Sequence, residues 1–215
     1  MAMIDSRPIF IAGSPRSGTT MLAGLLKLHG VWVGESRVTI DPASNSLIGT
    51  ENIPIKKAMG KLLHDIGYTN RKIPFPSETD MDQLDHDTVW KVLFDVVPHN
   101  KKWLYKSAGL LIFYKQFIEK FPEARWVLPR RNPQDIVDSI KRHAYMKFNA
   151  DTKDFVEYVL KHQFSVEEAV NHSMSINSKE VANLNMEVIE QYFNFCEVEM
   201  DEKIVCEFVN PKMMH

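Results

Sequence analysis

Hydrophobic and polar residues follow two different periods along the chain, which predicts a mixture of strands and helices. Short apolar runs that end at glycine, proline or charged residues are typical of buried strands. Apolar residues spaced three and four apart indicate helices that bury one face. Strands or extended segments are predicted at residues 8–11, 30–38, 103–107, 124–128 and 203–209. Helices are predicted at residues 21–28, 53–66, 81–97, 110–121, 133–140, 152–170 and 178–195.

The first predicted strand is followed by a loop of small residues and then by a helix. Residues 10–22 read FIAGSPRSGTTML, with glycine at positions 13 and 18. Glycine at these two positions lets the loop curl until several N–H groups point inward. Those donors, the positive end of the helix dipole and the hydroxyls of Ser17, Thr19 and Thr20 together form a cradle for a phosphate group.

The spacing of Gly13 and Gly18 matches the start of a Walker A loop, but Thr19 stands where the lysine should follow. Nucleoside triphosphate enzymes use that lysine on the β and γ phosphates, and the next hydroxyl on magnesium. Its absence therefore indicates a ligand without a γ phosphate. Arg16 supplies positive charge from within the loop instead.

The composition is that of an ordinary globular protein, with 44% hydrophobic and 25% charged residues. A length of 215 residues suits one core, so we expect one domain over residues 1–215. A net charge of −2 predicts no nucleic-acid or anionic-membrane partner, so any anion site must be a local cluster. Cys196 and Cys206 belong to no metal-binding motif. The sequence has no secretory pattern and no apolar run long enough to span a membrane, and we expect a cytoplasmic protein.

The PRSGTT sequence at residues 15–20, directly after a first strand, resembles the 5′-phosphosulfate loop of the sulfotransferases. This family uses 3′-phosphoadenosine 5′-phosphosulfate (PAPS) as sulfuryl donor, and the likeness is closest to tyrosylprotein-type and bacterial-type members. Its second motif is a strand that ends in arginine, followed by a helix that carries a serine eight residues after that arginine. Arg131 and Ser139 have this spacing, and Pro133 suits the first turn of the helix.

The resemblance implies how the donor binds. An arginine fork can take two phosphate oxygens, and a serine hydroxyl on the following helix adds a further donor. Arg131 and Ser139 are therefore expected to hold the 3′-phosphate. The 5′-phosphate is expected to bind Arg16, Ser17, Gly18, Thr19 and Thr20.

The resemblance also implies which residues are catalytic. The GESR segment at residues 34–37 is similar to the GEE-x-R stretch of tyrosylprotein-type members, which makes Glu35 the general base and Arg37 an acceptor-binding residue. Lys106 matches a family lysine that contacts the sulfuryl group, but the histidine that serves as base in cytosolic small-molecule members is missing after it. Arg16 and Lys106 would stabilise the charge that grows during transfer, so no metal is expected.

The resemblance implies an α/β, P-loop-like three-layer fold with a mostly parallel central sheet flanked by helices. Residues 40–100 are expected to form a helical acceptor-side segment, and residues 203–209 resemble a late family strand with Glu207 at its acidic position. The predicted activity is sulfuryl transfer from PAPS to an acceptor hydroxyl or amine, which leaves 3′-phosphoadenosine 5′-phosphate (PAP). The acceptor could be a small molecule, a sugar or a peptide, and the oligomeric state stays open.

Two other functions stay open at this point. A non-catalytic relative of the family would bind PAP or PAPS but transfer nothing to any acceptor. A nucleotide or small-molecule kinase on a degenerate P-loop would turn over ATP with magnesium, and Thr19 in place of the lysine argues against it.

Overall fold

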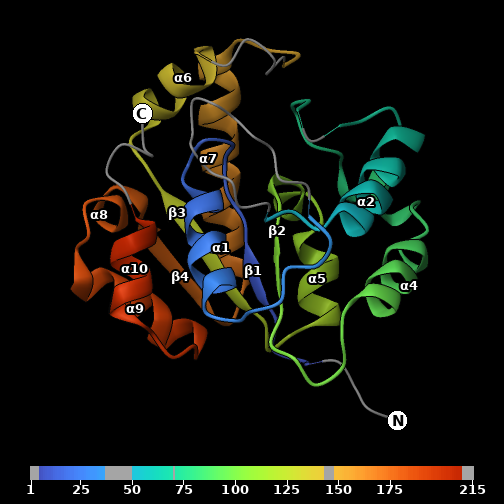
Figure 1. Ribbon diagram of the computed structural model, residues 1–215. Coiled ribbons are helices and arrows are strands. Elements are labelled where there is room, and N and C mark those ends of the chain that lie inside the picture. The colour runs from blue at the N-terminus through green and yellow to red at the C-terminus, as the bar shows by residue number, and fades with distance from the viewer. Residues whose placement is uncertain (1–4, 37–49, 70, 143–147, 210–215) are drawn as a thin grey trace.

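A parallel four-stranded sheet lies at the centre of the structure, a computed structural model that describes residues 5–36, 50–69, 71–142 and 148–209. Its strand order is β2-β1-β3-β4, and all neighbours run parallel (Figure 1). The strands are β1 (Ile9–Ile11), β2 (Leu104–Lys106), β3 (Arg125–Arg130) and β4 (Ser173–Asn177). The helices are α1 (Thr19–Leu28), α2 (Ile53–Asp65), α3 (Glu78–Asp82), α4 (Asp87–Val96), the 3₁₀ helix η1 (Ala108–Leu111), α5 (Tyr114–Lys120), α6 (Pro133–Lys141), α7 (Thr152–Ala169), α8 (Ser178–Ala182), α9 (Met186–Cys196) and α10 (Glu202–Phe208).

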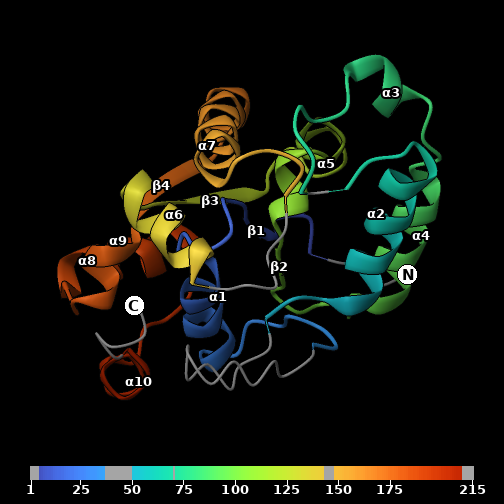
Figure 2. The same cartoon turned by 90° about the horizontal axis from the view of Figure 1, so that it is seen from above.

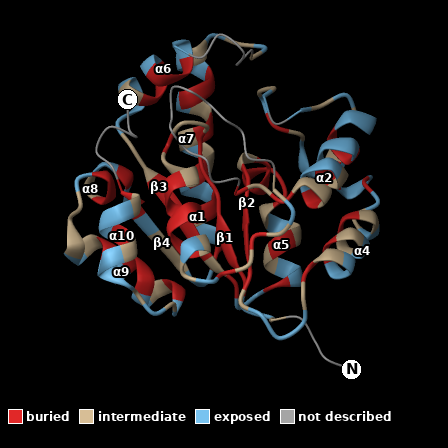
Figure 3. Ribbon diagram, viewed as in Figure 1, coloured by how far each residue is buried: buried red, intermediate tan, exposed pale blue. Residues whose placement is uncertain are grey.

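Helices cover both faces of the sheet, which gives three layers. Side chains alternate along β1, so Ile9 and Ile11 enter one core and Phe10 enters the other. The first core is shared with α1, α9 and α10, and the second with α2, α4, α5 and α7. Figure 2 shows α1 and α10 on one side of the sheet, α7 on the other, and α2 and α4 beyond β2. Both β1 and β2 are buried throughout (Figure 3), and the predicted α/β class with a parallel sheet is confirmed.

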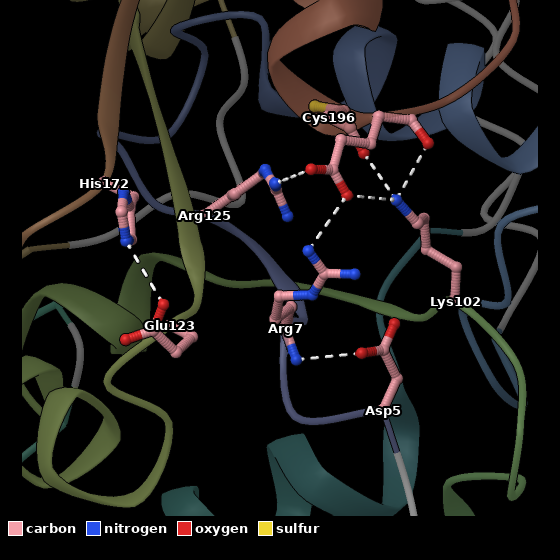
Figure 4. Close-up of polar contacts among 8 residues, drawn as sticks. Asp5, Arg7, Lys102, Glu123, Arg125, His172 and Cys196 are labelled. Atoms are coloured by element: carbon pink, nitrogen blue, oxygen red, sulfur yellow. Dashed lines mark hydrogen bonds and ion pairs between the residues drawn. The ribbon is translucent and has the colours of Figure 1, made fainter.

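A charged cluster closes the amino-terminal end of the sheet (Figure 4). Arg7, Lys102 and Arg125 lie at or just before the starts of three strands, and all three form ion pairs with the carboxylate of Glu197. The distances from Glu197 Oε2 are 3.5 Å to Arg7 Nη1 and 3.6 Å to Lys102 Nζ. Lys102 Nζ also donates to the carbonyls of Cys196 (2.9 Å) and Glu197 (2.8 Å). One carboxylate thus ties the starts of three strands to the end of α9.

The strand predicted at residues 203–209 is wrong, because this segment forms the helix α10. Asp201 is the helix N-cap, and its carboxylate accepts from the amides of Lys203 (2.9 Å) and Ile204 (3.2 Å). Phe208 then packs against Gly24 of α1, where an added Cβ would lie 2.6 Å from the ring. A short apolar run fits either a strand or a buried helix, and here the cap decides.

Two long predicted helices are each interrupted. Residues 81–97 divide between α3, which ends at Asp82, and α4, which begins at Asp87 after the N-cap His86. Between the two helices, the Asp85 carboxylate accepts hydrogen bonds from the Asp87 amide (3.2 Å) and from Thr88 Oγ1 (2.9 Å). Residues 178–195 divide between α8 and α9. Leu184, between these two helices, has a φ of 58°, which no α-helix can continue.

One strand is not predicted from the sequence. It is β4, in which only two apolar residues alternate with polar ones, and it pairs in parallel with β3. Conversely, the described part of the segment at 30–38 contributes only an isolated bridge between Trp32 and Trp103. The helix predicted at 110–121 begins as η1 and continues as α5.

Candidate active site

The loop between β1 and α1 is closed by its own hydrogen bonds. The amide and the hydroxyl of Ser17 both donate to the carbonyl of Ser14, at 3.2 and 2.7 Å. Arg16 and Gly18 have φ angles of 66° and 97°, so the loop turns sharply before α1 begins at Thr19. The N-cap, Gly18, has no side chain to cap the first turn, and no acidic residue stands in that turn. The first amides of α1 therefore present hydrogen-bond donors and the positive end of the helix dipole to an anion.

Ser178, the first residue of α8, locks this loop from the opposite side. Its hydroxyl donates toward the carbonyl of Ser17 and lies 3.0 Å from the carbonyl of Arg130 at the end of β3. A Cβ added at Gly18 would lie 2.5 Å from the Ser178 Cβ. The site therefore requires glycine at position 18 both for its backbone angles and for space.

The two sequence motifs meet in space, although 123 residues separate Arg16 from Ser139. Arg16 Nε donates to Ser139 Oγ at 3.0 Å, and Arg131 Nη1 donates to the carbonyl oxygen of Arg16 at 3.0 Å. Ser139 is buried on the inner side of α6, while Arg131 lies between β3 and that helix. Figure 1 places α6 and the loop before α1 at the same end of the sheet.

Positive charge accumulates where the motifs meet. Burial lowers the pKa of the Arg131 guanidinium, and the neighbouring cations Arg16 and Arg142 lower it further. Asp135 acts in the opposite direction and raises the pKa. Three arginines near one carboxylate repel each other, and this arrangement is typical of a site that binds an anion of high charge.

Lys106, the last residue of β2, reaches the other side of the same loop. Its side chain is buried, and Nζ lies 3.3 Å from Thr20 Oγ1 on α1. The same Nζ forms an ion pair at 3.1 Å with Glu51 Oε1, a residue that precedes α2. The second carboxylate oxygen of Glu51 pairs with Lys56 on the surface of α2.

The charges of Glu51 and Lys106 depend on each other. Burial raises the pKa of the Glu51 carboxyl, but the nearby Lys106 and Lys56 outweigh this effect, and the pKa falls to about 2. Burial likewise lowers the pKa of the Lys106 ammonium, and Glu51 counteracts that decrease. Glu51 is thus an anion at every physiological pH.

Glu35 lies at the end of the extended segment that leads away from Trp32, with its side chain exposed. Its carbonyl oxygen accepts a hydrogen bond from the amide of Ile53 (3.0 Å), which places Glu35 beside the start of α2. Gly34 has a φ of 81°, and an added Cβ there would collide with the side chain of Asn52. Arg37, the predicted acceptor-binding residue, lies outside the described residues.

Two residues of this site were missed by sequence reasoning. Glu51 carries no local signal, because its partner Lys106 is 55 positions away. Ser178 begins the helix predicted at 178–195, directly after the N-cap Asn177, but no local pattern reveals its contact with the loop 161 residues earlier.

Across residues 5–36, 50–69, 71–142 and 148–209, no group of three or more His, Cys, Asp or Glu side chains is placed to hold a metal ion. In the same part of the chain, no helix combines the length and apolar character needed to cross a membrane.

A three-layer fold with a tight, glycine-containing loop between its first strand and first helix defines a P-loop-like α/β protein. The chain belongs to the sulfotransferase family, whose family model matches residues 8–192. A search of curated proteins gave no match.

Similar solved structures are bacterial sulfotransferases. The sulfotransferase STF1 of Mycobacterium tuberculosis H37Rv has a TM-score of 0.61 at 14% identity, covering 97% of this chain and 71% of that protein. The sulfotransferase domain of the Synechococcus PCC 7002 olefin synthase gives 0.55 at 16% identity, covering 94% and 77%. A sulfotransferase of Alicyclobacillus acidocaldarius gives 0.56 at 16% identity, covering 92% and 88%. At these identities the likeness establishes the fold, and together with the family it supports a transferase.

Proposed function

We propose that this protein transfers a sulfuryl group from PAPS to an acceptor hydroxyl or amine. The observation that carries the proposal is the meeting of Arg16, Arg131 and Ser139 beside an uncapped helix N-terminus. A nucleotide with a phosphate at each end of its ribose fits such a pair of adjoining cationic sites.

The donor-binding residues divide into two groups. The backbone amides of Gly18, Thr19 and Thr20 and the hydroxyls of Thr19 and Thr20 would hold the 5′-phosphate. Ser17, whose amide and hydroxyl both donate to the carbonyl of Ser14, would shape the loop around that phosphate, together with Ser178. Arg131 and Ser139 would hold the 3′-phosphate. The clustering of Arg131 with Arg16 and Arg142 supports this assignment, because their mutual repulsion is relieved when a phosphate binds.

Arg16 stands closer to the 3′-phosphate pair than the sequence suggested, since its Nε bonds to Ser139. That position supports a donor-binding role for Arg16. A second role at the sulfuryl group requires the guanidinium to leave Ser139, and an arginine has enough rotatable bonds for that movement. Lys106, next to Thr20, is already positioned to stabilise charge on the departing phosphate oxygen.

PAPS supplies an activated sulfuryl group on its 5′-phosphate. As the acceptor oxygen or nitrogen forms a bond to sulfur, the bond between sulfur and the phosphate oxygen breaks, and PAP leaves. The acceptor proton passes to the carboxylate of Glu35, which acts as general base. Residues 40–100, which include α2, α3 and α4, would form the acceptor side, with Arg37 as an acceptor-binding residue.

The proposal is tested by transfer from PAPS labelled with radioactive sulfur to a panel of a phenol, a sugar, a tyrosine peptide and an amine. We expect label to reach at least one acceptor class, and Glu35→Gln to slow transfer about 100-fold, within the range of general base catalysis. Glu119→Gln, an exposed change on α5, is the matched control and should keep the wild-type rate.

The other outcomes separate the remaining functions. Full transfer by a folded Glu35→Gln protein would remove Glu35 from the base role. PAP binding without transfer to any acceptor would favour the non-catalytic relative. Turnover of ATP with magnesium would favour the kinase.

A further inference from the structure

Glu51 contacts a residue of the proposed active site but has no role in the chemistry described above. We propose that Glu51 is a positioning residue, whose carboxylate holds the Lys106 ammonium against the phosphate loop and keeps it positively charged. This inference rests on the proposed function, because it assigns Lys106 to the donor.

The geometry leaves Lys106 little freedom. Its side chain is only 8% exposed, and Nζ lies between Thr20 Oγ1 at 3.3 Å and Glu51 Oε1 at 3.1 Å. One of these partners belongs to the helix that follows the phosphate loop, and the other precedes α2. The two contacts therefore define where the ammonium points.

Glu51 is itself fixed at the start of α2. The next residue, Asn52, is the N-cap of this helix, and its side chain accepts from the Ile55 amide at 3.1 Å. The amide of Ile53 donates to the carbonyl of Glu35 at 3.0 Å. The carboxylate is thus presented from a rigid helix start rather than from a free loop.

A buried lysine needs such a neighbour. Removing an ammonium from water favours its neutral form, and a neutral lysine could not stabilise a developing negative charge. An anion at hydrogen-bonding distance counteracts this effect. Because its pKa is about 2, Glu51 stays charged and is a poor proton acceptor, which distinguishes its role from that of Glu35.

Two of the described charged groups act on Lys106: Glu51, which precedes α2, and Lys56, which lies on α2. Tyr105, the preceding residue of β2, interacts with Glu51 instead. Lys56 opposes the charge of Lys106, while Tyr105 is kept protonated by burial, which raises the pKa of its hydroxyl. Among the described groups, Glu51 is therefore the one that favours the ammonium form.

The inference is tested by calorimetric titration with PAP from about pH 7 to about pH 11, a range that includes the ordinary lysine pKa of about 10.4. The proteins compared are the wild type, Glu51→Gln, Lys106→Met and the double variant. Any protonation change of PAP itself affects all four equally, so it cancels in the comparison. For Glu51→Gln we expect the pH at which affinity falls to drop by about one unit or more. Lys106→Met should bind PAP weakly and show no pH transition in affinity. The double variant should show no transition either.

Two further variants guard against a purely structural effect. Glu51→Asp keeps the charge and should move the transition back toward that of the wild type. Lys56→Gln breaks only the outer half of the Glu51 contact. Because Lys56 opposes the charge of Lys106, this variant should raise the transition slightly and not lower it. If Glu51→Gln does not fold, the comparison is made with Glu51→Asp, whose shorter side chain predicts a smaller shift in the same direction.

The failures are distinguishable. If the wild type binds PAP and Glu51→Gln keeps the wild-type transition, the inference alone is overturned. A uniform loss of affinity at every pH, repeated in the Lys106→Met background, also overturns it, because that result is structural. Wild-type protein that does not bind PAP at any pH overturns the proposed function, and the inference with it.

Discussion

Gly18→Ala is the substitution whose cost can be worked most directly from the structure. At a φ of 97°, an L-residue in place of glycine costs about 1–2 kcal/mol. The new Cβ would lie 2.5 Å from Ser178 Cβ and 2.8 Å from Ser178 Oγ, and overpacking of this kind costs about 1–3 kcal/mol. The single proton of the Ser178 hydroxyl lies between the carbonyl oxygens of Ser17 and Arg130, so the side chain cannot move aside without losing its hydrogen bond to them. We expect a total loss of about 2–5 kcal/mol in the free energy of unfolding.

Gly30→Ala is the matched control. Gly30 has a similar φ of 85°, but an added Cβ would meet nothing within 4 Å, so only the backbone cost of about 1–2 kcal/mol applies. Both variants are compared with the wild type by urea unfolding at unchanged m value. Equal losses in the two variants would refute the contact between the loop and α8. As a second check, Gly18→Ala should cost less in a Ser178→Gly background.

Two smaller predictions concern the ends of the fold. Glu197→Gln should lower the free energy of unfolding by about 1 kcal/mol, because three cations lose a half-exposed partner, and the loss should be smaller in high salt. The control is Glu199→Gln, since the described residues show no ion pair for Glu199. An equal loss of stability in the control would contradict this account. A thiol reagent should modify the exposed Cys206 in the folded protein but not Cys196, because burial raises the pKa of the Cys196 thiol to about 12. If the folded Cys206→Ser protein is still labelled, this prediction is contradicted.

The parts of the fold that local sequence determines could be predicted. The strand, loop and helix of residues 8–28 follow from an apolar run, two glycines and a helical stripe, all within one short segment. The strand predicted at residues 203–209 is wrong because the apolar run there has no decisive period, while the N-cap residue Asp201, just before it, indicates a helix. Strand β4 is not predicted because it is a half-exposed edge strand with few apolar residues.

The site divides in the same way. The residues of the phosphate loop and the spacing of Arg131 and Ser139 are local patterns, and the sequence contains them. The contact of Arg16 with Ser139 and the pairing of Glu51 with Lys106 are set by the sheet order, which brings distant segments to one edge. No spacing along the chain encodes such contacts.

The central claim is that one nucleotide bridges the loop before α1 and the Arg131–Ser139 pair. Calorimetric titration of the wild type with PAP, with 5′-ADP and magnesium ATP as comparators, tests it most directly. We predict that PAP binds at least about 100-fold more tightly than 5′-ADP, and that Arg131→Met removes most of this preference, as the loss of a bidentate phosphate contact requires. Equal affinity for PAP and 5′-ADP in the wild type would contradict the account.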